Sequence, residues 1–177
     1  MNDPHDEFEP VFELERRFLV ADPRIAEGAD WELITQAYIF SVQGFAVRVR
    51  RVQRPVGGIL DEGKAWMTGK GPRYGAKREE YDLEVSPLWA EQVIQRSANV
   101  VSKRRYHVVT DQTWEVDEFL ADNVGLWVAE LEGGTDIFKA GLPAWVKREL
   151  LNEPRFNNEE LAVSPISEWA DRADVVV

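Results

Sequence analysis

The sequence predicts an α+β domain whose main element is an antiparallel, closed or nearly closed eight-stranded β-barrel with helices packed outside. Three observations support this: eight short segments alternate apolar and polar residues, turn residues separate them, and charged side chains occupy one face of most of them. The chain has 177 residues, of which 44% are hydrophobic, which is enough for one domain with a packed core. We expect this domain to span residues 11–177, after a flexible acidic arm at residues 1–10.

The expected strands follow from the period-two pattern, because the side chains of a strand alternate between two faces. Turn residues such as Pro55, Gly57 and Gly58 separate them. Many strands at short spacing favour a barrel or sandwich over a sheet with alternating helices. The expected strands are Phe12–Val20, Glu32–Ser41, Phe45–Gln53, Lys64–Lys70, Lys77–Val85, Val100–Thr110, Thr113–Phe119 and Leu126–Leu131.

Helices are expected where this pattern is interrupted. Ser86 and Pro87 supply an N-cap and a first helical residue, and apolar residues follow at helical spacing over Leu88–Ala98. These helices would pack on the apolar faces of the strands. The other expected helical segments are Thr135–Ala140, Pro143–Leu151, Asn158–Val163 and Ser167–Ala173.

The composition excludes several classes of protein. Cysteine is absent, so disulfides, thiol catalysis and zinc–thiolate sites are ruled out. The net charge of −11 should repel nucleic acid and anionic membranes. The sequence also has no apolar run of about 18 residues that would span a membrane. We therefore expect a cytoplasmic protein with a small-molecule partner, and neither nucleic acid nor membrane as partner.

Charged residues occur at positions i and i+2 in most of the expected strands, and residues two apart share a face. A single such pair is typical of a solvated face. The complete set differs, because nearly every position on one face carries an ionised group. The groups that share a face are Glu13, Glu15 and Arg17; Arg48 and Arg50; Arg78, Glu80 and Asp82; Lys103 and Arg105; Glu115 and Asp117; and Glu130 and Glu132.

These groups suit two kinds of ligand. Acidic pairs without histidine or cysteine suit hard cations such as Mg²⁺ or Mn²⁺, which prefer oxygen ligands. Arginine pairs suit phosphate, because the planar guanidinium group donates paired hydrogen bonds. The charged face is therefore expected to line the interior of the barrel.

The order of these motifs resembles that of the CYTH superfamily, the triphosphate tunnel metalloenzymes. Glu13-Leu14-Glu15-Arg16-Arg17 resembles its N-terminal ExExK signature, and Thr68-Gly69-Lys70-Gly71-Pro72 resembles its TxKGP segment. No single motif is specific, but the ordered series from Phe12 to Glu132 is. Its other members are Val47-Arg48-Val49-Arg50, Arg78-Glu79-Glu80-Tyr81-Asp82, Lys103-Arg104-Arg105, Glu115-Val116-Asp117 and Glu130-Leu131-Glu132.

The resemblance implies a role for each charged group. The implied ligands of Mg²⁺ or Mn²⁺ are Glu13, Glu15, Asp117, Glu130 and Glu132. The implied triphosphate-binding residues are Arg48, Arg50, Lys70, Arg78, Lys103 and Arg105. The implied catalytic residues are Glu80, Asp82, Glu115 and Arg17. Two positions depart from the family pattern: Arg17 stands where lysine is usual and Asp82 where glutamate is usual, and both bear on substrate preference and rate.

The resemblance further implies metal-dependent hydrolysis of a triphosphate inside the charged barrel. Inorganic tripolyphosphate is the first candidate substrate, followed by a nucleoside triphosphate or thiamine triphosphate. One alternative is a class IV adenylyl cyclase, which would need a site that recognises the base. Another is a non-catalytic module that binds polyphosphate or a nucleotide and needs no metal carboxylates.

Overall fold

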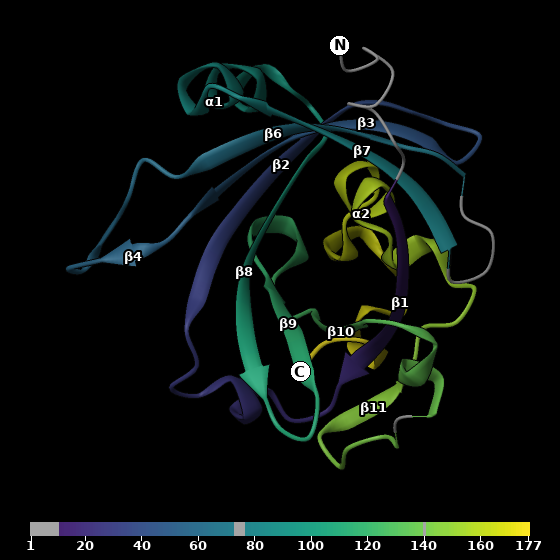
Figure 1. Ribbon diagram of the computed structural model, residues 1–177. Coiled ribbons are helices and arrows are strands. Elements are labelled where there is room, and N and C mark those ends of the chain that lie inside the picture. Colours follow the sequence, from purple (N-terminus) through teal and green to yellow (C-terminus); the bar gives the residue numbers. More distant parts are fainter. Residues whose placement is uncertain (1–10, 73–76, 140) are drawn as a thin grey trace, which may run out of the picture.

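The main element of the computed structural model is an antiparallel sheet of nine strands (Figure 1). The structure describes residues 11–72, 77–139 and 141–177, with the backbone alone at 11–13, 77–78 and 135. The strand order is β10-β9-β8-β2-β3-β6-β7-β1-β11, and β1 also pairs with β10. The strands are β1 (Val11–Val20), β2 (Trp31–Val42), β3 (Phe45–Gln53), β6 (Lys64–Lys70), β7 (Lys77–Val85), β8 (Val100–Val109), β9 (Thr113–Phe119), β10 (Trp127–Glu132) and β11 (Val146–Glu149).

The prediction of a closed or nearly closed eight-stranded barrel is wrong, because the described residues form one sheet of nine strands. The additional strand, β11, pairs with β1 through Phe18 and Glu149 and lies at the edge of the sheet. Its residues belong to Pro143–Leu151, which the sequence analysis predicted to be helical. The pairing of β1 with both β7 and β10 nevertheless makes the sheet curve around one concave face (Figure 1).

The helices differ from the expectation in where they lie. The predicted helix at Leu88–Ala98 is confirmed as α1 (Pro87–Arg96), which packs its buried Ala90 against Val49 and Ala65 on the convex side of the sheet. The predicted helix at Asn158–Val163 is confirmed as α2, but the start of α2 reaches the concave side. The prediction that all helices pack outside is therefore wrong for α2.

The shorter elements complete the chain. Short 3₁₀ helices occupy much of the segments Thr135–Ala140 and Ser167–Ala173, at Thr135–Lys139, Ile166–Glu168 and Arg172–Asp174. A separate hairpin of β4 (Pro55–Val56) and β5 (Ile59–Leu60) follows β3. Residues 1–10, where the acidic arm was predicted, lie outside the described residues. In the described part of the chain, neither α-helix combines the length and the hydropathy that a membrane crossing requires.

Two apolar clusters pack against the sheet, and one of them holds it to the C-terminal segment. One joins Leu19 and Val128 to Phe156 and Leu161, so it links β1 and β10 to the segment around α2. The other surrounds Trp114, whose ring makes edge contacts with neighbouring aromatic rings. Burial of this apolar surface fixes the curvature of the sheet and brings the charged face of each strand toward the others.

Candidate active site

A pocket on the concave face of the sheet is lined almost entirely by charged and polar side chains. The basic residues come mainly from β3, β6 and β8, whereas most of the acidic residues come from β1 and β10. The two kinds of charge therefore meet in one space. The basic lining residues are Arg17, Arg48, Arg50, Lys70, Lys103 and Arg105, and the acidic ones are Glu15, Glu130, Glu132 and Glu159.

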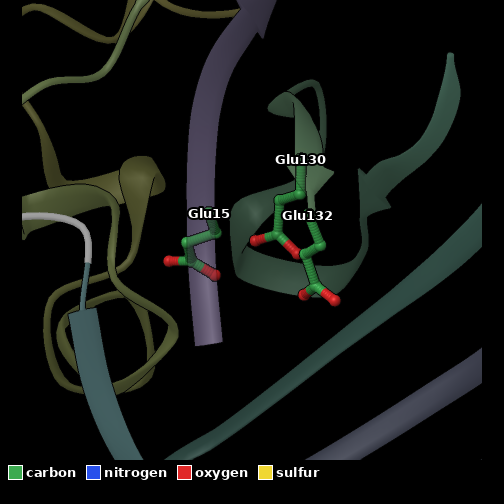
Figure 2. A group of neighbouring side chains, drawn as sticks. All are labelled: Glu15, Glu130 and Glu132. Atoms are coloured by element: carbon green, nitrogen blue, oxygen red, sulfur yellow. The ribbon is translucent and has the colours of Figure 1, made fainter. Parts of the chain in front are cut away.

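Three of the carboxylates form a cluster suited to a metal ion. Glu15 projects from β1 toward Glu130 and Glu132 of β10, and Figure 2 shows their carboxylates turned toward a common space. One ligand oxygen of each lies within 4.8 Å of the others. The register explains this proximity, because Glu15 lies opposite Glu132 on the neighbouring strand. Carboxylate oxygens without nitrogen or sulfur ligands suit a hard divalent cation.

Arg105 is the centre of one ion-pair network at the site. Its Nε and Nη2 donate to the two oxygens of Asp117 at 2.8 Å each, and Nη2 also donates to Glu130 Oε2 at 2.5 Å. Its Nη1 contacts Glu115, and Lys103 Nζ donates to Asp117 Oδ2 at 2.5 Å. The two cations therefore neutralise carboxylates from both β9 and β10.

A second network joins β2, β3, β6 and β7. Glu80 forms an ion pair with Lys70, and Arg48 Nη2 lies 3.8 Å from Glu80 Oε1. Arg48 Nη1 also donates to Gln36 Oε1 at 3.2 Å, and the Gln36 amide donates to the Tyr38 hydroxyl at 3.3 Å. Arg48, Glu80 and Gln36 are all buried, so this network fixes the direction of the Arg48 guanidinium.

Arg50 differs from its neighbours. None of the ion pairs between described side chains includes Arg50, and its buried Nε has no hydrogen-bond partner there. Its guanidinium lies over the Trp66 ring, 5.5 Å from the centroid. Burial, and then the neighbouring Arg48, lower the pKa of Arg50. Asp82 and Glu115 raise that pKa through charge alone.

Two carboxylates of the site, Glu130 and Glu115, have shifted pKa values. Burial raises the pKa of Glu130, but the cations Arg105, Lys103, Arg17 and Lys70 outweigh it and hold that pKa at about 2. Burial raises the pKa of Glu115. Although burial lowers the pKa of the Arg105 guanidinium, the carboxylates around it raise that pKa well above its ordinary value. Glu130 is therefore ionised at neutral pH, whereas Glu115 binds a proton more readily than an ordinary glutamate.

The predicted metal ligands fall into three groups. Glu15, Glu130 and Glu132 lie together. Asp117 is fully buried and its oxygens are engaged by Lys103 and Arg105. Glu13 lies opposite Arg78 in the register of β1 and β7, but both side chains are outside the described residues.

The predicted catalytic residues are dispersed. Glu80 and Glu115 each contact a cation that lines the pocket. Asp82 is exposed and accepts a hydrogen bond from the Thr68 hydroxyl at 2.5 Å. Arg17 lies 3.6 Å from Glu15, and it also donates to Phe156 O at 3.2 Å and to Asn157 Oδ1 at 2.7 Å. Arg17 thus connects the pocket to the start of α2.

Several residues that line the pocket from β2 and from the start of α2 are not predicted from the sequence. Gln36 and Tyr38 carry no charge, so the charge pattern does not mark them, although their spacing places them on one face. Asn157, Asn158 and Glu159 reach the pocket from the far end of the chain. The charge pattern of the strands does not mark them, because their position depends on how the C-terminal segment returns to the sheet.

Comparison with known proteins identifies a curated relative that aligns with most of this chain. An inorganic triphosphatase from Acetivibrio thermocellus is 32% identical over 164 residues, which cover 90% of this chain and 98% of the relative. No protein-family model matches the sequence.

Solved structures share the fold. The crystal structure of the inorganic triphosphatase NE1496 has a TM-score of 0.62 at 24% identity and covers 87% of this chain and 96% of that one. The structure of the PH1819 protein from Pyrococcus horikoshii has a TM-score of 0.50 at 20% identity and covers 72% of this chain and 82% of that one.

Proposed function

Because the chain belongs to the CYTH family of triphosphate tunnel metalloenzymes, we propose that it is a triphosphatase that hydrolyses inorganic tripolyphosphate with a divalent metal ion. The observation that carries the proposal is the pocket itself, in which a row of cations faces a cluster of carboxylates. A triphosphate with its metal ion has the complementary distribution of charge. Tripolyphosphate comes before nucleoside and thiamine triphosphates because the curated relative is named an inorganic triphosphatase.

The basic residues would bind the phosphate chain. Arg50 could bind a phosphate without breaking an ion pair between described side chains. Gln36 and Glu80 orient the guanidinium of Arg48. Lys70, Lys103 and Arg105 line the same pocket. Fixed cations around the phosphoryl oxygens stabilise the charge that is spread over them in the transition state. Arg78, which lies on β7 beyond Glu80, is proposed as a further phosphate ligand.

The carboxylate cluster would hold the metal ion, which we propose to be Mg²⁺ or Mn²⁺. Glu15, Glu130 and Glu132 fit such an ion because they offer only oxygen ligands close to one another. Glu13 and Asp117 are proposed as additional ligands, directly or through water. A divalent cation bound there would neutralise charge on the phosphoryl oxygens and make the phosphorus more electrophilic.

Glu115 is the proposed acceptor of the proton from the attacking water. Burial raises its pKa, so it takes up a proton more readily than an ordinary glutamate. Glu80 and Asp82 are proposed to orient that water or to support a second metal ion. Arg17 is proposed to assist from the edge of the pocket, where it contacts Glu15.

The test is phosphate release from tripolyphosphate, ATP and thiamine triphosphate, each with Mg²⁺, with Mn²⁺ and with a chelator. We expect metal-dependent release, fastest from tripolyphosphate. Cyclic AMP from ATP would instead assign a cyclase. Absence of any product from a folded sample whose melting temperature rises with tripolyphosphate would assign a binding module.

A matched pair of variants tests the site. Glu130→Gln removes one carboxylate of the cluster and should abolish turnover without loss of the fold. Glu118→Gln alters a residue of β9 that pairs with Arg104 and does not line the pocket, so it should retain activity. Full activity of Glu130→Gln would remove Glu130 from the metal site.

A further inference from the structure

The convex side of the sheet is only partly covered by α1. The buried Ala90 of α1 packs against Val49 and Ala65, so the helix lies over β3 and β6. In Figure 1, α1 lies over one end of these strands, and the β2–β3 hairpin extends beyond it at the other end. The part of the convex side next to α1 therefore presents its strand side chains without this helix above them.

The strand register places five large apolar side chains on this uncovered part. Val47 shares the face of Val49, because the two are two positions apart on β3. Residues directly opposite one another on neighbouring strands also share a face, and this relation extends through Gly69 and Met67 of β6 to β7. The five side chains are Phe40 and Val42 of β2, Phe45 of β3, and Tyr81 and Leu83 of β7.

Trp89 of α1 borders these five side chains. On the helix, Trp89 and Glu91 lie on opposite flanks of the buried Ala90. Glu91 pairs with Arg51, which lies on the opposite side of Val49 from the five apolar residues. Trp89 therefore lies on the flank of α1 that faces them. We call Trp89 and the five strand residues the outer apolar patch.

The outer apolar patch is exposed. The exposed fractions of its six side chains lie between 40% and 53%. Gly69 lies between its two halves, and a Cβ added there would meet no atom of the described residues within 4 Å. No described side chain thus packs on the centre of the patch.

The patch is large enough for an interface between two proteins. Six side chains that are each about half exposed present roughly 500 Å² of apolar surface, because a large aromatic side chain alone offers roughly 150–250 Å². Apolar patches of this size mark interaction sites. Two such patches packed together would bury roughly 1,000 Å², which reaches the lower limit of a specific interface.

A second copy of this chain fits the patch better than a membrane does. The net charge of −11 repels an anionic lipid surface. The six side chains of the patch are uncharged, so two identical patches can meet without repulsion between them. Asp82 and Glu84 alternate with Tyr81 and Leu83 and point to the other face of β7. Pairing two β7 strands edge to edge would bring these carboxylates together, so the faces and not the edges should meet.

We propose that the protein is a homodimer in which the outer apolar patches of two copies pack against each other around a two-fold axis. Such a contact uses the same patch on both copies and closes after two. Because the interface lies on the convex side, the charged pocket on the concave side of each copy stays accessible. The dimer does not depend on the proposed function, since its mass is measured without substrate.

The first test is the mass of the wild-type chain by sedimentation equilibrium at a series of micromolar concentrations, without substrate or metal ion. We expect twice the mass of one chain, with dissociation only on dilution. A monomer at every concentration would overturn the proposal. Masses that keep rising beyond the dimer would indicate a head-to-tail contact and would overturn it as well.

Matched variants test whether the patch forms the interface. Leu83→Asp and Phe45→Asp each place a charge in the interface twice, so the dissociation constant of the dimer should rise by about 100-fold or more. Ile59→Asp is the control, because Ile59 is also apolar and exposed but lies on the β4–β5 hairpin, outside the patch. It should keep the wild-type dissociation constant. Urea unfolding identifies the folded variants, and a folded patch variant with wild-type dimerisation would overturn the proposal.

Deletion of residues 1–10 tests the chain's own N-terminal segment as the alternative occupant. These residues precede Val11, which lies opposite Glu80, one position before Tyr81 of the patch. We expect the shortened chain to dimerise as the full chain does. A full chain that is monomeric, together with a shortened chain that dimerises, would assign the patch to residues 1–10 and overturn the proposal.

Discussion

Replacement of Arg50 by alanine removes the one pocket guanidinium that forms no ion pair among the described side chains. If Arg50 is a phosphate ligand, the variant loses the charge-assisted hydrogen bonds between Arg50 and the substrate, which contribute about 1.5–3 kcal/mol. That loss corresponds to a fall in kcat/KM of roughly 10- to 150-fold. Stability should hardly change, because no carboxylate is left without its partner. We expect the free energy of unfolding to change by less than about 1 kcal/mol, mainly from the lost contact with Trp66.

The assay is tripolyphosphate hydrolysis at saturating Mg²⁺, with urea unfolding of the same samples. Arg51→Ala is the control, because Arg51 lies next in β3 and pairs with Glu91 on the other side of the sheet. It should keep wild-type kcat/KM. An Arg50→Ala enzyme with wild-type kcat/KM would refute the role of Arg50 in substrate binding. A fall in stability of more than about 3 kcal/mol would instead identify Arg50 as a structural residue.

Three further predictions follow from individual contacts. The pKa of Glu130 is about 2 in the folded protein, whereas its ordinary value is 4.5, so the stabilisation that ionised Glu130 provides is complete above pH 4.5 and is lost as the pH falls toward 2. Urea unfolding at a series of pH values should therefore show a weaker loss of stability in acid for Glu130→Gln than for the wild type. An unchanged loss would assign the acid dependence to other groups. Arg17→Lys cannot keep both hydrogen bonds to Phe156 and Asn157, so urea unfolding should show a loss of about 1–2 kcal/mol, and unchanged stability would mean that this contact does not hold α2. His107 is exposed and its Nε2 lies 3.8 Å from Glu32 Oε1, so His107→Ala should change kcat by less than about 3-fold, whereas a large loss would place His107 in the chemistry.

The strands were predictable because each carries its own alternation of apolar and charged residues. Phe45–Gln53 and Lys64–Lys70 have the bounds that the pattern predicts. Which strands pair with one another was not predictable from this alternation. The short β11 pairs with β1, more than a hundred residues away in the sequence. It has only four residues, which are too few to distinguish the apolar spacing of a strand from that of a helix.

The chemistry of the site was predictable from residue types, but the partner of each side chain was not. The alternation of residues predicts that Glu115 and Asp117 share one face of their strand. Both contact Arg105, which is consistent with that prediction. It could not show that Asp117 faces cations, whereas Glu130 and Glu132 approach Glu15. That division depends on the register between strands and on side-chain rotamers.

The contact between Arg105 and Glu130 couples the two halves of the site thermodynamically. The Arg105 guanidinium forms an ion pair with Glu130, which belongs to the cluster of three carboxylates. On the proposed function, a cation at that cluster would compete with Arg105 for Glu130, and a phosphate at Arg105 would compete with Glu130 for the guanidinium. Each ligand therefore removes part of the internal competition that opposes the other. If both ligands bind as proposed, linkage requires the metal ion to raise the affinity for triphosphate by the same factor by which triphosphate raises the affinity for the metal ion.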